Sequence, residues 1–72
     1  MNFGEDLKKC RKEMGYSQKE LAKLLGVNQS SVSDWENDVS RPDYETLFKL
    51  CLIFNVSICQ LLNVDEYTYE KK

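Results

Sequence analysis

The side chains best suited to chemistry in this sequence gather in one stretch, GVNQSSVSDWEN, at residues 26–37. Gln29 offers an amide donor beside an amide acceptor, and each serine hydroxyl can donate or accept a hydrogen bond. The chain contains no histidine, which removes Ser-His-Asp and Cys-His catalysis and most zinc sites. The stretch therefore predicts recognition by hydrogen bonds, and we expect no enzymatic activity, cofactor, metal site or small-molecule substrate.

The polar residues of this stretch also have a simpler explanation, because the solvent-exposed face of any helix is usually polar. Exposed helix positions more often carry Lys, Glu or Arg, which propagate helices better than Ser or Asn. Three serines and a glutamine at residues 29–33 therefore indicate a demand other than helix stability. Composition alone leaves both explanations open.

The size of the chain sets the number of domains. With 72 residues, 42% of them hydrophobic, it can form one small core and not two. No apolar run approaches the roughly 18 to 20 residues that span a bilayer, and the N-terminus is acidic and polar. We therefore expect a soluble, cytoplasmic protein that does not bind membranes.

Cys10, Cys51 and Cys59 match no zinc-ligand spacing and are predicted to be reduced, small hydrophobic residues.

The charges are distributed unevenly along the chain. The net charge of −2 argues against a protein that binds nucleic acid by charge alone. Residues 1–33 carry six basic and four acidic side chains, whereas residues 34–72 carry four basic and eight acidic ones. The N-terminal half is therefore the more favourable half for an anion, by a small excess.

Four residues with side-chain oxygens precede apolar-periodic stretches, as helix N-caps do: Ser17, Asn28, Asp43 and Ser57. The residue before each cap pairs with an apolar residue five positions further on, which is the pattern of a hydrophobic staple. Ser17 with Glu20, and Ser57 with Gln60, also complete capping boxes.

These starts, with Gly15 and Gly26 as stops, predict helices at about 3–14, 18–25, 29–36, 44–54 and 58–62. One face of the first helix is predicted to carry Leu7, Cys10, Arg11 and Met14. The short connection at Gly26 predicts a helix-turn-helix. The fold class is therefore all-α, a compact five-helix domain over residues 1–64, with residues 65–72 as an extended or disordered tail.

The string SQKELAKLLGVNQSSVSDWEN, with RPDYETLFKLCLIFNVSICQLL after it, carries a family resemblance. From Leu7 to Asn63 the chain resembles the Cro/C1-type helix-turn-helix family, also called the XRE family, of prokaryotic and phage regulators. In the motif, Gln18 opens the second helix, Ala22 allows close helix crossing and Gly26 stands at the turn. Its apolar positions hold Leu21, Leu25, Val27, Val32 and Trp35. The resemblance implies a lambda-repressor-like DNA-binding domain.

Two acidic residues depart from the family pattern. Asp34 stands where relatives often have a basic or neutral residue, and a carboxylate beside a phosphate is repelled. Asp38 stands where relatives usually have the glycine that ends the helix, and Asp adopts the left-handed conformation less readily than Gly.

The resemblance also implies roles for individual residues. In the family the third helix enters the major groove of DNA, so Gln29, Ser30 and Ser33 would read base edges. Phosphates would be held by Ser17, Gln18, Asn28, Asn37, Ser40 and Arg41. Arg11 and Glu36 would form an internal ion pair, and Trp35 would belong to the core.

The function implied is a sequence-specific transcriptional regulator, a repressor that binds a palindromic operator in double-stranded DNA as a homodimer. Residues 61–69, with Leu61, Leu62, Val64, Tyr67 and Tyr69, would either pair two copies or form a frayed tail. The alternative is a protein-interaction module, such as an antitoxin or the partner of a regulatory protein, that keeps the fold with weak or no DNA binding. The acidic balance, Asp34 and Asp38 favour that alternative.

Overall fold

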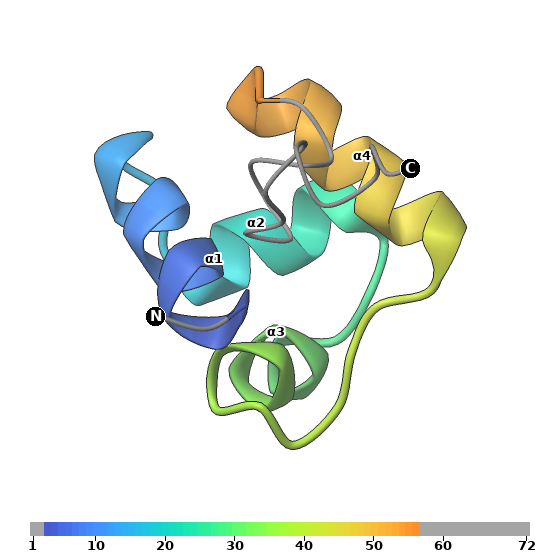
Figure 1. Cartoon of the computed structure of the whole chain (residues 1–72). Coiled ribbons are helices and arrows are strands. Elements are labelled where there is room, and N and C mark those ends of the chain that lie inside the picture. Colours follow the sequence, from blue (N-terminus) through green and yellow to red (C-terminus); the bar gives the residue numbers. More distant parts are fainter. Residues whose placement is uncertain (1–2, 57–72) are drawn as a thin grey trace, which may run out of the picture.

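The computed structural model describes residues 3–56, and this part of the chain consists of four helices without strands (Figure 1). The helices are α1 (Phe3–Glu13), α2 (Gln18–Leu25), α3 (Gln29–Glu36) and α4 (Tyr44–Phe54). The predicted bounds of the last three are confirmed, and α1 ends one residue before its predicted end. The predicted fifth helix at 58–62, its cap at Ser57 and the tail lie outside the described residues.

Two of the predicted side-chain caps begin their helices as expected. The Ser17 hydroxyl accepts the Glu20 N–H at 3.0 Å, while Glu20 Oε1 accepts the Ser17 N–H at 2.8 Å. This reciprocal pair is a capping box at the start of α2. At the start of α4, Asp43 Oδ1 accepts the Thr46 N–H at 2.9 Å.

The prediction that the Asn28 side chain caps α3 is wrong. Asn28 has the extended backbone of an N-cap residue, but its side chain accepts no hydrogen bond from α3. The N–H of Ser31, which such a side chain would accept, instead donates to the backbone carbonyl of Asn28 at 3.0 Å. Because this N–H is already satisfied, the exposed amide of Asn28 is left for other contacts.

All four helices end in the same backbone motif. A residue with positive φ follows each helix, and the next residue donates its N–H to the carbonyl five positions earlier, as in a Schellman motif. The positive-φ residues are Gly15, Gly26, Asp38 and Asn55. Asp38, at φ 60°, adopts the left-handed conformation, to which glycine is better suited.

The N-terminal turn of α1 lies directly against the end of α3. A Cβ on Gly4 would overlap the backbone carbonyl of Glu36 and lie 2.9 Å from the carbonyl oxygen of Trp35, so glycine is required here. The Gly4 N–H donates to Asp38 Oδ1 at 3.1 Å. Asp38 therefore places a carboxylate at the N-terminus of α1, where the helix dipole favours a negative charge.

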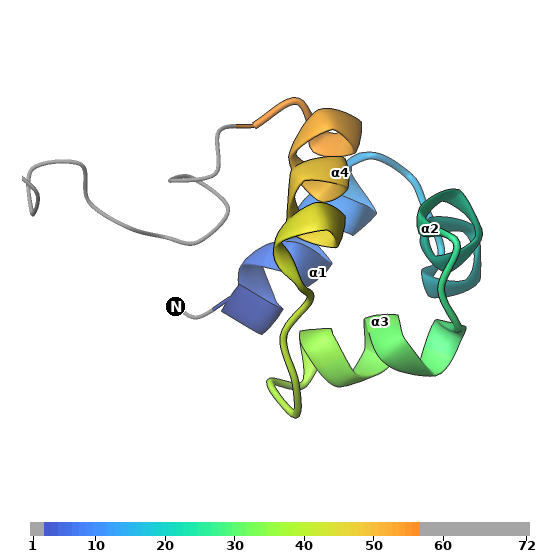
Figure 2. The same cartoon turned by 90° about the vertical axis from the view of Figure 1, so that its right-hand side faces the viewer.

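The core lies between the helices and is apolar. Its members are Phe3, Leu7, Leu21, Ala22, Leu25, Val32, Trp35, Leu47, Leu50 and Phe54. In both views α3 lies at one end of the described part of the molecule, with the other three helices to one side of it (Figures 1 and 2). This arrangement leaves the opposite side of α3 facing outward.

Met14 and the cysteines differ in how deeply the fold buries them. Met14 was expected on the apolar face, but it follows the last residue of α1 and is 45% exposed, because the chain already turns at Gly15. Cys10 and Cys51 are free, half-buried and packed against the core. Burial raises the pKa of both thiols, and the nearby Glu13 raises that of Cys10 further, so both stay protonated.

Within residues 3–56, none of the helices has the length and apolar character that crossing a membrane requires.

Candidate nucleic-acid interface

Helix α3 has one buried face and one open face. Val32 and Trp35 point into the core, with exposed fractions of 0% and 6%. The open face carries Gln29, Ser30, Asp34 and Asn37, which are exposed, and Ser33, which is half-buried. The residues predicted to read bases therefore share one outward surface with Asp34.

A buried ion pair fixes the C-terminal end of α3. The Arg11 guanidinium donates to Glu36 from Nε to Oε2 at 2.6 Å and from Nη2 to Oε1 at 3.2 Å. Its Nη1 donates to the carbonyl oxygen of Tyr16 at 2.9 Å. Both charged residues are only 8% exposed. The ion pair implied by the family resemblance is therefore present, and it ties α3 to α1 and to the segment before α2.

Gln18 connects this buried pair to the open face of α3. Its Nε2 donates to Glu36 Oε1 at 2.9 Å, and its Oε1 accepts a long hydrogen bond from Gln29 Nε2 at 3.5 Å. The sequence predicted only a phosphate contact for Gln18. Its bond to Gln29 was missed because the two residues lie on different helices, and no spacing within the sequence reports that contact.

Ser33 and Asn37 bond to each other rather than standing free. Asn37 Nδ2 donates to the backbone carbonyl of Ser33 at 2.9 Å and approaches its hydroxyl at 3.4 Å. Ser33 and Asn37 therefore offer fewer free polar atoms to a ligand than Ser30, which is exposed.

The residues predicted to hold phosphates fall into two groups along the chain. Ser17, Gln18 and Asn28 lie at the N-terminal ends of α2 and α3, and Asn37, Ser40 and Arg41 follow the end of α3. All except the half-buried Gln18 are exposed. The Arg41 guanidinium carbon lies 4.9 Å from the centroid of the Phe3 ring, a cation–π contact that orients the side chain.

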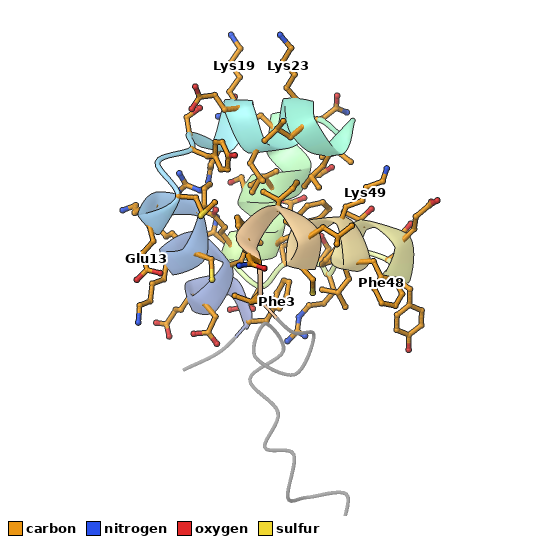
Figure 3. All side chains as sticks on the ribbon, turned by 90° about the horizontal axis from the view of Figure 1, so that it is seen from above. Phe3, Glu13, Lys19, Lys23, Phe48 and Lys49 are labelled. Atoms are coloured by element: carbon orange, nitrogen blue, oxygen red, sulfur yellow. The ribbon has the colours of Figure 1, made fainter. Side chains whose placement is uncertain are left out.

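The charges around α3 are sparse. The helix itself carries two acidic residues and no basic one, and of these Asp34 is exposed while Glu36 is buried in its pair. Lys19 and Lys23, one turn apart on α2, are exposed and extend away from the other helices (Figure 3). Sequence reasoning assigned them no role, although their spacing of one turn was visible. Within residues 3–56, no cluster of side chains could hold a metal ion.

Comparisons with known proteins agree with this geometry. The sequence model of a helix-turn-helix family matches residues 7–61. The regulator ImmR of Bacillus subtilis (strain 168), a helix-turn-helix transcriptional regulator, is 42% identical over 66 residues, which cover 92% of this chain and 52% of ImmR. The chain spans about half the length of the curated relatives it matches.

Two solved structures with similar folds contain DNA. The P22 c2 repressor in complex with a synthetic operator has a TM-score of 0.83 and 31% identity, with 90% of this chain and 98% of that chain covered. SinR, described as the master regulator for biofilm formation, in complex with DNA has a TM-score of 0.74 and 38% identity, covering 82% of this chain and 98% of that one.

Proposed function

The chain belongs to the Cro/C1-type helix-turn-helix family, and from this premise we propose that it is a sequence-specific transcriptional regulator. It binds a palindromic operator in double-stranded DNA as a homodimer, with α3 in the major groove, and it represses transcription. This role places it in the cytoplasm, with the DNA of a prokaryotic cell.

The observation that carries the proposal is the open face of α3, which presents hydrogen-bonding side chains on a rigid support. Gln29 and Ser30 are exposed, while the same helix is held from behind by the buried pair of Arg11 and Glu36. A face that reads bases needs its side chains fixed before DNA binds, because ordering them afterwards reduces affinity.

In this proposal the contacts divide into those that specify and those that position. Gln29 bonds through its amide to the N6 and N7 atoms of an adenine, and Ser30 and Ser33 contact neighbouring base edges. Two sets of residues bind the phosphates, one at the starts of α2 and α3 and one after the end of α3. They hold the DNA backbone on either side of the groove. Lys19 and Lys23 on α2 add positive charge that favours the approach of DNA.

For the homodimer, α4 supplies a candidate surface within the described residues. Tyr44, Phe48 and Leu52 are spaced four residues apart and are 79%, 59% and 81% exposed, so they form an apolar stripe along the helix. Glu45 and Lys49 flank the stripe on one side, one turn apart. If two copies of α4 pack antiparallel about a twofold axis, Glu45 of each faces Lys49 of the other, so the surface complements itself in shape and charge.

The same stripe supports a second candidate function, a protein-interaction module. An exposed apolar stripe on a chain with a net charge of −2 also fits a different protein partner, with DNA binding weak or absent.

The test is selection of the purified chain against a pool of random double-stranded DNA, followed by titration of enriched duplexes at two salt concentrations. A DNA regulator enriches a palindrome, and its affinity falls steeply as salt rises because bound counterions are released. No enrichment at low salt, from protein whose circular dichroism shows a folded helical domain, would reject DNA binding in favour of the interaction module.

A further inference from the structure

Asp34 lies on the open face of α3, where a DNA-binding protein gains little from a negative charge. It is exposed, and it follows the exposed Ser30 by one helical turn. Between the phosphates of a major groove a carboxylate is repelled and loses water, unless a hydrogen-bond donor of the DNA compensates it.

The carboxylate of Asp34 takes no part in holding the fold. It forms no hydrogen bond or ion pair within residues 3–56, and the exposed charges elsewhere on the surface do not pair with it. Its backbone, by contrast, is fixed, because the Asp34 carbonyl accepts the N–H of Val39 at 2.8 Å and that of Ser40 at 3.5 Å. The structure therefore holds the backbone of Asp34 in a defined place and leaves its carboxylate available to accept a hydrogen bond.

We infer that Asp34 is a specificity-determining residue that accepts a hydrogen bond from the exocyclic N4 amino group of a cytosine in the operator. The inference rests on the proposed function and deepens it, since it names a base that this surface selects. An ionised carboxylate only accepts hydrogen bonds, so it needs a base that donates.

The major-groove edges of the four bases decide which one. Guanine presents two acceptors and thymine presents an acceptor and a methyl group, so both repel a carboxylate or leave it unpaired. Adenine presents an amino donor, but its N7 acceptor lies beside that donor. Cytosine presents its N4 amino donor without a neighbouring acceptor on the same base, and it suits a carboxylate best.

Such a residue acts more by rejecting wrong sites than by strengthening the right one. At a C·G pair the amino group offsets the desolvation of Asp34, whereas at other pairs the carboxylate lies against acceptors or a methyl group, or against an amino donor with an acceptor beside it, and is compensated less. We therefore expect replacement of this cytosine to weaken binding by about 5- to 150-fold, the range typical of one mismatched base pair.

The experiment uses the duplex that the wild-type chain selects, with all four base pairs substituted at each position, and measures dissociation constants for wild type, Asp34→Ala and Asp34→Asn. Asp34→Ala should flatten the preference for cytosine at one position in each half-site and bind other sequences more tightly than wild type does. Asp34→Asn should move the preference at that position to adenine, which pairs with Asn through N6 and N7.

Glu13→Gln serves as the matched control. Glu13 is an exposed carboxylate at the end of α1, outside α3 (Figure 3), so its removal changes the net charge as Asp34→Asn does. It should leave the preference at every position unchanged.

The outcomes separate this inference from the proposed function. If Asp34→Ala tightens binding to every sequence alike and the profile of preferences is unchanged, Asp34 only repels DNA and the inference is wrong, while the proposed function stands. If the wild-type chain selects no duplex at all, the proposed function fails and the inference fails with it. Because both Asp34 and Glu13 are exposed, all three variants should keep the wild-type melting temperature, which confirms that the comparison is made between folded proteins.

Discussion

At the scale of single residues, the proposed recognition surface depends on a series of contacts that runs from the interior to the outside. Arg11 bonds to Glu36, Glu36 accepts from Gln18, and Gln18 accepts from Gln29. The side chain expected to read a base is thereby connected to a buried ion pair. A buried pair of this kind orients its surroundings more reliably than it stabilises them, because desolvation offsets much of its attraction.

The first prediction concerns Glu36. Glu36→Ala should lower the free energy of unfolding by about 3 to 5 kcal/mol, since it leaves Arg11 buried without its partner. Urea denaturation followed by circular dichroism would measure the change, with the exposed Glu13→Ala as a control that stays near the wild-type value. An unchanged midpoint for Glu36→Ala would show that the ion pair does not hold α3 in place.

At the scale of the helices, the starts were more predictable than the ends. Caps with an oxygen side chain before an apolar repeat located the starts of α2, α3 and α4 from the sequence. Of the four Schellman ends, the sequence predicts the two that contain glycine, at Gly15 and Gly26. Asp38 and Asn55 adopt the same left-handed conformation, but their residue types indicate it less clearly. A non-glycine residue adopts positive φ where other contacts stabilise that conformation. For Asp38 such a contact is the hydrogen bond from Gly4, which joins segments far apart in the sequence and so cannot be predicted from local pattern.

The candidate site was predictable to a similar degree. The polar face of α3 followed from the positions of Val32 and Trp35, and both are buried as predicted. Two features of the site were not predictable, because each depends on a competing partner. The side chain of Asn28 does not cap α3, since the backbone carbonyl of Asn28 accepts the Ser31 N–H instead. The Ser33 hydroxyl is not fully free for a ligand, since the Asn37 amide bonds to it.

The second prediction tests Asp38 as a helix end and as a cap for α1. Asp38→Ala should destabilise the protein by about 1 to 2 kcal/mol, because alanine is strained at positive φ and offers no acceptor to Gly4. Asp38→Asn should destabilise it less, since Asn tolerates this conformation and keeps an acceptor oxygen. Thermal unfolding of both variants would compare them; equal losses would contradict the role of Asp38 as a cap.

The third prediction concerns acid and the start of α4. Hydrogen bonds from the backbone and side chain of Thr46 lower the pKa of Asp43 below its ordinary value of 3.8. A lowered pKa in the folded state means that ionised Asp43 stabilises the fold above the unfolded pKa, and that this contribution is lost as the pH falls through the folded value. Melting temperatures of wild type and Asp43→Asn should therefore differ most near neutral pH and converge in strong acid. A difference that stays constant across this range would contradict the assignment.

At the scale of the whole molecule, the surfaces proposed for recognition and for pairing lie on different helices. The face of α3 is open at one end of the described structure (Figure 2), while the apolar stripe of Tyr44, Phe48 and Leu52 runs along α4. One recognition helix reads too few base pairs to find a site in a genome, so the function proposed here depends on the second copy as much as on α3.

The fourth prediction separates pairing from folding. Phe48→Glu should shift the chain from dimer to monomer in sedimentation experiments and weaken operator binding. Its melting temperature measured at low concentration should stay close to that of wild type, because Phe48 is 59% exposed. Leu24→Glu, at a 53% exposed position on α2, is the matched control and should leave the dimer intact. A wild-type chain that is monomeric even on its operator would reject α4 as the pairing surface.

The most direct test of base reading by α3 is the set of dissociation constants of wild type, Gln29→Ala and Asn28→Ala for a selected operator and its single-base-pair variants. We expect Gln29→Ala to lose discrimination at one base pair in each half-site, by about 1 to 3 kcal/mol. Asn28→Ala, which removes a proposed phosphate contact, should weaken binding to all these sequences alike. If Gln29→Ala also weakens all of them equally, or none, the open face of α3 does not read the bases of DNA.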